Sequence, residues 1–382
     1  MIIKRIKKVI NNTRFYKKIS KTSFYSRYRG LLPTVPPSIC DDRDLMGNDV
    51  EAVKLEWPSG LNKPRVGVVQ DTTDCPRWTK YCRFLDTNAI PYSFYDIDSA
   101  NWLEKAQSFD VIAIAVGSCQ QYYLEQLRRK CYILEYHLKK KCYPSYADIL
   151  LYEDKILEAY LAQQYGLPFI KTYIYNKMDE AIKAAAQFKY PIISKIVPGA
   201  CSVGIEMVDC EKKCLSVIKK AFSRAGRSTQ DFYLRQKNYV YFQDYVPNNG
   251  YDIRVVVVGD MVFGYYRKVL KGDFRASGMG EVEKRELPPK AMQIARKVND
   301  ILKNPMIVVD FLYGSDNEYY IIEISPIFGA STPEQLHVNG KPGVYIFSKD
   351  GSFHFKEGRY WTYELALKEF FQNSIISVNK TK

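Results

Sequence analysis

The chain of 382 residues is 46 % hydrophobic and 26 % charged, which leaves room for a large core or for two to three domains and excludes a fibrous or low-complexity protein. Its longest apolar run in a strand-like pattern, residues 111–116, is far shorter than a bilayer span, and no apolar signal sequence follows the start. We therefore expect a cytoplasmic protein that is soluble or peripheral to the membrane. Nine cysteines without a Cys-x-x-Cys pair argue against a disulfide framework and a zinc site, and three histidines argue against histidine-based catalysis.

The net charge of +14 is concentrated at the N-terminus. Residues 1–40 contain ten lysines and arginines and no acid, so the rest of the chain holds 46 basic and 42 acidic residues, a balance of +4. Between these cations, apolar residues recur at helical spacing, at Ile2, Ile3, Ile6, Val9 and Ile10. Such a basic amphipathic arm can lie on an anionic membrane surface or dock on the protein body, and nucleic acid ranks last because no known nucleic-acid module follows. We expect residues 1–30 to contact an anionic membrane or a lipid-linked glycan, with a linker from there to Gly60.

Strand and helix patterns alternate after residue 64, with strands at 65–70, 91–97 and 110–118 and helices at 77–88 and 120–130. This alternation predicts an open α/β domain with a parallel sheet. Asp71-Thr72-Thr73-Asp74 follows the first strand, at the position where such sheets bind ligands. Turn formation alone also favours aspartate and threonine there, so this segment is a weak indication of a substrate contact.

The next stretch combines two lysines with a loop of small residues. Lys155 lies in a helix that ends at Gly166, and Lys195 interrupts an apolar strand. In the loop of residues 198–204, Pro-Gly-Ala-Cys-Ser-Val-Gly, backbone N–H groups could approach a phosphate, with Lys195 supplying a positive charge beside them. An ordinary hairpin connection beside a solvent-facing lysine is the alternative.

Three arginines follow on strands and a loop. One strand ends at residues 243–246, and two more carry Asp252, Arg254 and Arg267 before a loop with Arg275. Arginines gathered on adjacent strands can clamp an oxyanion or a phosphoryl group. Arginines on antiparallel strands also face solvent in many proteins, so both interpretations remain open at this point.

Residues 306–325 predict a β-hairpin around a cluster of turn formers. Each strand carries one carboxylate in an apolar run, and a loop of two or four residues would place Asp310 opposite Ile321 and diagonal to Glu323 on one face. Ser325, two residues beyond Glu323, joins that face. Carboxylates on a buried strand favour a hard divalent cation, and a half-solvated hairpin with two ordinary acids is the alternative.

The last part of the chain predicts a loop and a closing unit. The loop after Ser325 could border an acceptor site, where Ser331 or Glu334 could contact substrate. A hairpin through Lys349-Asp350-Gly351 and a final helix follow.

Taken in order, these motifs resemble the ATP-grasp superfamily, in its glutathione synthetase and ribosomal-protein glutamate ligase branch. The resemblance covers residues 147–332 and rests on the order and spacing of the motifs, from Lys155 through "SK", "PGACSVG", "QDYV", "GYDIRVVVVGD" and "DFRASG" to Asp310 and Glu-x-Ser at 323–325. It implies an α/β (α+β) chain in which an ATP-grasp fold follows a small parallel-sheet domain and a basic arm. The expected units are residues 1–60 (arm and linker), 61–146 (α/β domain), 147–240 (nucleotide lid), 241–336 (catalytic and metal subdomain) and 337–382 (hairpin and helix).

The resemblance also implies roles for single residues. It assigns ATP contacts to Lys155, Lys195, Gly199, Cys201, Ser202, Gly204, Gln243, Asp244, Tyr245, Val246 and Asp252, with the loop of residues 199–204 over the β- and γ-phosphates, 243–246 at the adenine edge and Asp252 at the ribose. It places Arg254, Arg267 and Arg275 at the transferred phosphoryl group and the acyl phosphate. It assigns Mg²⁺, for which Mn²⁺ can substitute, to Asp310, Glu323 and Ser325, and substrate contacts to Ser277 and Ser331. The family usually has Glu-x-Asn where this chain has Glu-x-Ser, and a serine hydroxyl is shorter and a poorer metal ligand than an amide oxygen, so one metal site is expected to be weaker or completed by water.

The implied activity is ATP-dependent amide formation between a carboxylate and an amine through an acyl phosphate, which requires no covalent enzyme nucleophile. The basic arm favours a uronic acid of a cell-surface polysaccharide precursor as the acid. An amino acid or peptide ligase that acts on a protein or a soluble small molecule is the alternative. The rival from another class is a nucleotide-binding scaffold or sensor without turnover, which Ser325 makes conceivable.

Overall fold

The computed structural model describes residues 38–47, 49–197, 204–228, 235–247, 250–269 and 281–380. The expectations for the basic arm up to residue 37 and for five of the site residues lie outside these ranges, namely those for Gly199, Cys201, Ser202, Arg275 and Ser277. None of the helices that the described residues form is both long and apolar enough to cross a membrane.

The N-terminal unit is built on a four-stranded parallel sheet in the order β2-β1-β3-β4, as the alternating pattern predicted. Its elements are β1 (Val66–Val69), α4 (Trp78–Thr87), β2 (Tyr92–Phe94), α5 (Trp102–Ala106), β3 (Val111–Ile114), α6 (Gln121–Tyr132), the π-helical turn η2 (Ile133–His137) and β4 (Lys141–Tyr143), preceded by the short helix η1 (Arg43–Leu45). All residues of β1 and β3 are buried, and alternate side chains of β3 enter two different apolar clusters. This pattern follows from the two-residue period of a strand whose sheet is covered on both faces.

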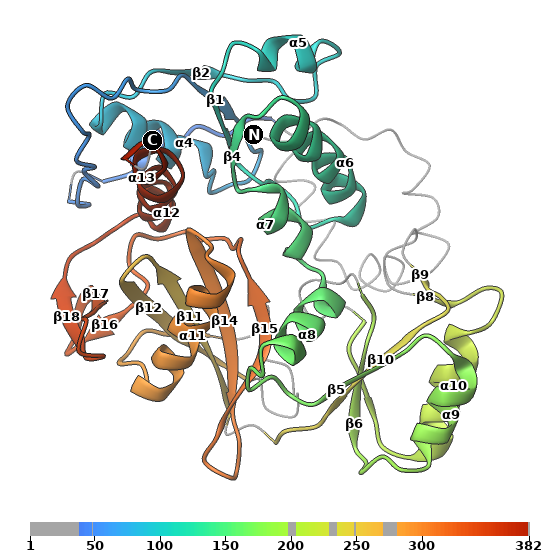
Figure 1. The fold of residues 1–382 in the computed structure, drawn as a ribbon. Helices are drawn as coiled ribbons and strands as arrows, with labels where there is room; N and C mark the ends of the chain where they lie inside the picture. Colours follow the sequence, from blue (N-terminus) through green and yellow to red (C-terminus); the bar gives the residue numbers. More distant parts are fainter. Residues whose placement is uncertain are drawn as a thin grey trace, which may run out of the picture.

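A smaller antiparallel sheet, in the order β5-β10-β6-β7, forms the second unit. It follows α7 (Tyr146–Leu151) and α8 (Lys155–Gln164) and contains β5 (Thr172–Tyr175), α9 (Met178–Ala185), β6 (Ile192–Lys195), β7 (Glu206–Val208), α10 (Glu211–Ala221), the pair β8 (Arg227–Ser228) and β9 (Arg235–Gln236), and β10 (Val240–Asp244). Helices α9 and α10 lie together on its outer side (Figure 1) and share a separate apolar cluster with the sheet. This unit therefore has a small core of its own.

The third unit is an eight-stranded sheet in the order β15-β14-β11-β12-β17-β16, with β13 on β12 and β18 on β17. Its elements are β11 (Tyr251–Val258), β12 (Met261–Lys268), β13 (Val282–Glu283), α11 (Pro289–Leu302), β14 (Met306–Tyr313), β15 (Tyr319–Ser325), β16 (His337–Val338), β17 (Lys341–Phe347), β18 (Phe353–Glu357), α12 (Thr362–Phe371), η3 (Gln372–Ile376) and α13 (Ser377–Lys380). Helix α11 packs against β11 and β14.

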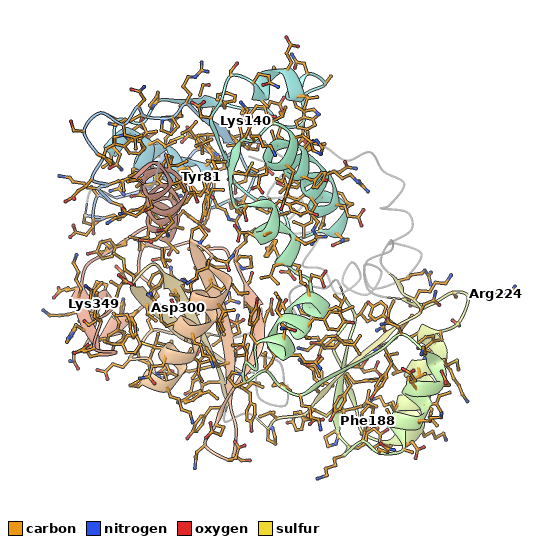
Figure 2. The ribbon with its side chains drawn as sticks, in the orientation of Figure 1. Tyr81, Lys140, Phe188, Arg224, Asp300 and Lys349 are labelled. Carbon is orange, nitrogen blue, oxygen red and sulfur yellow. The ribbon has the colours of Figure 1, made fainter. Side chains whose placement is uncertain are left out.

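The first and third units share one apolar core. Helix α12 returns from the large sheet to pack on α4 (Figure 1), and the ring of Tyr81 on α4, labelled in Figure 2, lies edge-on to the ring of Tyr363 on α12 at 6.4 Å. Residues of β1, β11 and β14 belong to the same buried cluster. The N-terminal sheet is thus fixed against the large sheet, and the loops at their junction have defined positions.

The predicted hairpin of β14 and β15 forms, but its predicted register is wrong. The connecting loop has five residues, so Tyr313 faces Tyr319, and the register shifts once more between Asp310 and Phe311. As a result Asp310 faces Glu323 directly instead of Ile321. A β-bulge, which opposes two residues to one, leaves Ile322 without a ladder partner and brings the two carboxylates together.

Candidate active site

The large sheet meets α8 and the small sheet near β15 (Figure 1). Charged side chains of β11, β12, β14, β15, β6 and α8 interact with one another there. The strand register places Arg254 beside Asp310 and Asp252 beside Arg267 on neighbouring strands. The small sheet is tied to this edge because the backbone of Ile321 exchanges hydrogen bonds of 2.8 and 2.9 Å with residues 168 and 170. The large sheet, the small sheet and α8 therefore contribute to one site.

Asp310 is the centre of a buried ion-pair network. Its carboxylate, 2 % exposed, accepts hydrogen bonds from Nε and Nη2 of Arg254 at 2.8 and 2.7 Å and from Nη2 of Arg267 at 2.7 Å. Burial by itself would raise the pKa of Asp310, but the guanidinium groups of Arg254 and Arg267 outweigh burial and hold this pKa far below its ordinary value. Asp310 is therefore ionised at any physiological pH, as a metal-binding carboxylate must be.

Asp252 completes this network from the next strand. Its two oxygens accept hydrogen bonds of 2.6 Å from Nε and Nη2 of Arg267. Burial raises the pKa of Asp252 to about 6, although Arg267 acts against that rise. The carboxylate thus orients Arg267 in this structure, and the contact between Asp252 and a ribose stays a prediction.

Lys155 joins α8 to the second carboxylate of the hairpin. It is the first residue of α8, after the N-cap Asp154, and its side chain is 8 % exposed. Its Nζ lies 3.6 Å from Oε1 of Glu323 and 3.7 Å from Oε2 of Glu153. Burial would lower the pKa of Lys155, but Glu323, Glu158 and Glu153 together raise it, so the ammonium stays charged.

Glu158 is a site residue that the sequence reasoning missed. It is 1 % exposed, one of its oxygens accepts a 2.9 Å hydrogen bond from the backbone N–H of Ile324, and Oε1 has no partner among the described residues. Burial raises its pKa to about 8. Its spacing of three residues from Lys155 puts both on one face of α8, and that spacing was the available signal.

Lys195 lies at the end of β6, opposite Tyr241 on β10, and is 8 % exposed. Burial, and then the charge of Lys155, lower its pKa to about 8. The backbone N–H of Ile196 donates a 3.1 Å hydrogen bond to the carbonyl of Gly204, so the described end of the small-residue loop lies beside this lysine. Lys195 therefore lies near both Lys155 and Gly204, and the contacts of these residues with ATP stay a prediction.

The segment 243–246 leaves β10 close to the same lysines. The amide of Gln243, 2 % exposed, donates hydrogen bonds to the hydroxyls of Thr172 and Tyr241 at 2.9 and 3.0 Å. Asp244 ends the strand, its N–H bound to the carbonyl of residue 171, and Tyr245 and Val246 are half-buried beyond it. The Gln243 side chain is thus committed to the sheet, and any adenine contact of this segment would come from its backbone.

The described residues include no group of three or more His, Cys, Asp and Glu side chains that could hold a metal ion. Asp310 and Glu323 nevertheless supply two adjacent carboxylates, which fits Mg²⁺ because this ion usually keeps several waters and takes phosphate oxygens as ligands. The hydroxyl of Ser325 donates a 2.6 Å hydrogen bond to the carbonyl of Ile327. Its remaining capacity as an acceptor leaves metal contact by Ser325 as a proposal.

The two predicted substrate residues of the following loop have different surroundings. Ser331 is exposed, whereas Glu334 is bound to Nε of Arg359 at 2.6 Å and to Nε2 of His337 at 3.0 Å. Glu334 therefore braces the loop against β16 and the segment before α12. Ser331 is free of that bracing and keeps its predicted role as a proposal.

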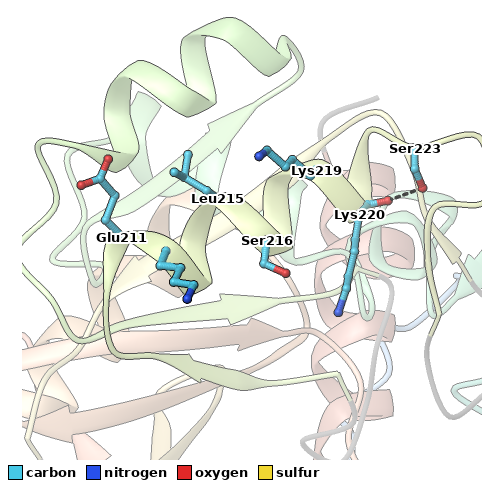
Figure 3. Close-up of a pocket in the computed structure, with 7 residues that line it drawn as sticks. Glu211, Leu215, Ser216, Lys219, Lys220 and Ser223 are labelled. Atoms are coloured by element: carbon cyan, nitrogen blue, oxygen red, sulfur yellow. Dashed lines mark hydrogen bonds between the residues drawn. The ribbon is translucent and has the colours of Figure 1, made fainter.

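A hollow of about 710 Å³ lies elsewhere, along the outer face of α10 (Figure 3). It is lined by Glu211, Lys212, Leu215, Ser216, Lys219, Lys220 and Ser223. The Ser223 hydroxyl donates a hydrogen bond of 2.8 Å to the carbonyl of Lys220. Its side chains are those of a solvated helix face, and none of the charged groups of the hairpin site reaches it. We assign no chemistry to this hollow.

The arrangement of these elements is the ATP-grasp fold. The crystal structure of D-alanine–D-alanine ligase from Bacillus anthracis complexed with ATP superposes with a TM-score of 0.51 over 84 % of this chain and 100 % of that chain, at 13 % sequence identity. At this identity the comparison establishes the fold alone.

Residues 153–339 match the family of the RimK-like ATP-grasp domain. Two relatives are similar over less than half of this chain. The α-aminoadipate–LysW ligase LysX of Saccharolobus solfataricus is 26 % identical over 178 residues, which is 46 % of this chain and 62 % of that protein. The coenzyme γ-F420-2:α-L-glutamate ligase of Methanocaldococcus jannaschii is 26 % identical over 174 residues, 44 % of this chain and 56 % of that protein. The similarity thus spans less than two thirds of either relative.

Proposed function

We propose that this protein is an ATP-dependent carboxylate–amine ligase that forms an amide through an acyl phosphate. The observation that carries the proposal is the direct opposition of Asp310 and Glu323 between two arginines on one side and Lys155 on the other. Acids and cations alternate there at hydrogen-bond or ion-pair distance. A triphosphate with a divalent cation has the same alternation of charge, so it can replace these internal pairs.

The lysines would bind the nucleotide. Lys155 and Lys195 present buried ammonium groups from two elements, and the loop of residues 199–204 would close over the β- and γ-phosphates. The backbone of residues 243–246 would hold the adenine edge, and Asp252 the ribose. Magnesium, or manganese in its place, would be held by Asp310, Glu323 and Ser325, and would neutralise phosphate charge and polarise the phosphoryl group.

The arginines would act on the transferred group. A carboxylate oxygen of the acid attacks the γ-phosphorus, the bond to the bridging oxygen breaks, and ADP leaves. Arg254 and Arg267, held in place by Asp310 and Asp252, stabilise the charge on the phosphoryl oxygens, with Arg275 as a third donor. The amine then attacks the acyl carbon, loses a proton, and the tetrahedral oxyanion collapses with release of phosphate.

For the amine, we propose an amino acid. The names of the two relatives specify α-aminoadipate and L-glutamate, both of which are amino acids. The acid would be a carboxylate of a peptide, a protein or a soluble small molecule. A uronic acid of a surface polysaccharide precursor is the second candidate, and the basic arm is the feature that favours it.

The decisive experiment is a screen for ADP release. ADP should form with Mg²⁺ only when an acid and an amine are both present, and Asp310→Asn or Lys195→Ala should abolish it. Tight ATP binding without turnover across a broad panel of acids and amines would instead favour a nucleotide-binding scaffold.

Membrane contact is a separate proposal with its own test. Removal of residues 1–30 should weaken sedimentation with anionic vesicles and leave turnover of soluble substrates intact, because none of the residues proposed above to bind ATP, magnesium or substrate belongs to residues 1–30. Equal vesicle binding by both forms would remove the membrane and the lipid-linked glycan from consideration.

A further inference from the structure

Arg77 at the start of α4 is a buried cation that the proposed chemistry does not use. It is the N-cap residue of the helix, and its side chain is 11 % exposed. Nη1 lies 3.5 Å from Oδ2 of Asp71, a long contact for an ion pair, and the guanidinium carbon lies 5.7 Å from the centre of the Tyr363 ring. Within the described part of the chain, the buried Nε of Arg77 has no hydrogen-bond partner. A buried charged donor without a partner is costly and calls for an explanation.

Asp71 does not supply the missing partner, because it is already engaged. One oxygen accepts from the hydroxyl of Thr73 at 2.6 Å, and the other accepts from the backbone N–H groups of Arg77 and Trp78 at 3.0 and 3.4 Å. The Asp71 side chain thus shapes the turn into α4, as the turn chemistry predicted. Arg77 retains most of its five donors for another group.

Gly329 is the residue of the loop after β15 that lies beside Arg77. Its neighbours Phe328 and Ala330 are 5 and 3 % exposed, whereas Gly329 itself is exposed. Apart from its two chain neighbours, a Cβ added to Gly329 would meet one atom of the described residues within 4 Å, Nη2 of Arg77 at 3.9 Å. An exposed glycine therefore lies beside an incompletely paired guanidinium.

The loop at Gly329 also contacts Arg254, one of the arginines proposed to bind the phosphoryl group. The hydroxyl of Tyr363 accepts from the N–H of Ala330 at 2.6 Å and donates to the carbonyl of Phe328 at 3.4 Å, which fixes the loop on both sides of Gly329. The guanidinium carbon of Arg254 lies 6.0 Å from the centre of the Phe328 ring. Phe328 thus contacts Arg254, and the next residue, Gly329, lies beside Arg77.

We propose that Arg77 binds a substrate carboxylate that is not the one activated by ATP. This inference rests on the proposed ligase function and adds a requirement to it, since one of the two substrates must carry a second carboxylate. A guanidinium fork suits a carboxylate because two parallel N–H groups match its two oxygens. The carboxylate could belong to an amino acid that serves as the amine, or to a dicarboxylic acid that serves as the acyl donor.

A purely structural Arg77 would behave differently. If it only joined α4 to α12 through Tyr363, its replacement would lower stability and would affect all ligands alike. A carboxylate-binding Arg77 distinguishes a ligand that has the carboxylate from its carboxamide. The decisive quantity is therefore the ratio of the affinity for the carboxylate ligand to the affinity for its carboxamide. A structural defect does not change this ratio.

The experiment measures binding by calorimetry to the full chain with Mg²⁺ and a non-hydrolysable ATP analogue, so that it does not depend on turnover. Glutamate, glutamine and isoglutamine test the amino acid arm, and glutarate against its monoamide tests the acyl arm. Arg77→Met, which keeps the length of the side chain, should weaken binding of the carboxylate ligand by about 10- to 100-fold and leave that of its amide unchanged. Arg77→Lys should recover part of the loss, and Arg129→Met should have no effect, because Arg129 is 65 % exposed and pairs with Glu125 on the surface of α6.

Equal losses for acid and amide in Arg77→Met would overturn the inference, as would a wild-type protein that binds none of these carboxylates. Equal melting temperatures of the wild type and Arg77→Met exclude misfolding of the variant. If Arg77→Met unfolds, the same affinity ratio is compared between the wild type and Arg77→Lys. Failure of the ligase proposal has a different signature, since ADP release would then be absent while the carboxylate preference at Arg77 persisted. In steady-state assays of an active pair, the KM of the carboxylate substrate should rise and that of ATP should stay within about twofold.

Discussion

Asp310 and Glu323 face each other across the β14–β15 hairpin, yet their surroundings differ sharply. The Asp310 side chain is 2 % exposed and held by two arginines, whereas that of Glu323 is 26 % exposed and has Lys155 at 3.6 Å. One carboxylate is therefore part of a buried network, and the other can move toward solvent or ligand.

This difference predicts unequal effects of two similar substitutions. Asp310→Asn leaves Arg254 and Arg267 without their shared anion and should lower the free energy of unfolding by about 3 kcal/mol in addition to abolishing ADP release. Glu323→Gln should also abolish ADP release but lower stability by less than about 1 kcal/mol, because its ion pair is partly exposed. Denaturant unfolding of both variants provides the measurement, and equal destabilisation would contradict the assignment of Asp310 to the centre of the network.

Lys195 should make nucleotide binding depend on pH. Burial and Lys155 lower its pKa to about 8, so in the free protein the ammonium is lost as pH rises through that value. Phosphate binding requires the charged form, and the affinity for Mg²⁺-ATP should therefore fall by up to about tenfold per pH unit above pH 8, with proton uptake on binding. Calorimetry in buffers of different ionisation enthalpy measures both effects.

Two variants control this pH experiment. Lys195→Arg keeps its charge throughout the range and should bind with a flat profile above pH 8. Lys177→Arg changes an exposed lysine of the same unit that pairs with Glu180, and its profile should match that of the wild type. A profile of Lys195→Arg that still declined above pH 8 would assign the titration to another group.

Gly264 on β12 should be intolerant of any side chain. It faces Val255 in the register of β11, and a Cβ at this position would lie 1.9 Å from the carbonyl oxygen of Arg254. Gly264→Ala must therefore displace β11, which carries Asp252 and Arg254, and we expect a stability loss of about 3 kcal/mol with a loss of activity. Gly166→Ala is the matched control: its Cβ would meet nothing within 4 Å, and it should cost only about 1 kcal/mol for its left-handed backbone at φ +59°. Similar stability of the two variants would show that β11 and β12 do not approach as closely as the structure has them.

If Ser325 contacts the metal, its replacement should change the Mg²⁺ concentration that ADP release requires. Because an amide oxygen is a better metal ligand than a hydroxyl, Ser325→Asn should lower the Mg²⁺ concentration for half-maximal ADP release, and Ser325→Ala should raise it. Ser325→Ala also removes the 2.6 Å hydrogen bond to Ile327 and should cost about 1 kcal/mol of stability. An unchanged Mg²⁺ requirement in both variants would show that Ser325 does not contact the metal and serves only the hydrogen bond to Ile327.

The large elements could be read from the sequence because local pattern and burial agree in them. The parallel N-terminal sheet, the helix of Lys155, the strand of Lys195 and the hairpin of Asp310 all follow from strand and helix periods between recognisable turns. The ATP-grasp family also followed from the order of motifs, since chemistry at a shared site constrains residue types along the whole chain. Domain boundaries and residue roles stay predictions at this level.

Tertiary structure alone decided how the charged residues meet. The sequence predicted Asp310 and Glu323 as diagonal neighbours, whereas in the structure they face each other directly. The reason is a five-residue loop and a β-bulge, which no short-range pattern encodes. Glu158 and Arg77 were inconspicuous in the sequence because an acid or arginine on a helix is usually solvated, and only long-range packing of α8 on β15 and of α4 beside the loop at Gly329 removed them from water. The sequence by itself determined which residue types and elements are present, through local periodicity and turn chemistry. The packing of distant elements determined which charges are buried together, because pairing, desolvation and register depend on contacts between residues far apart in the chain.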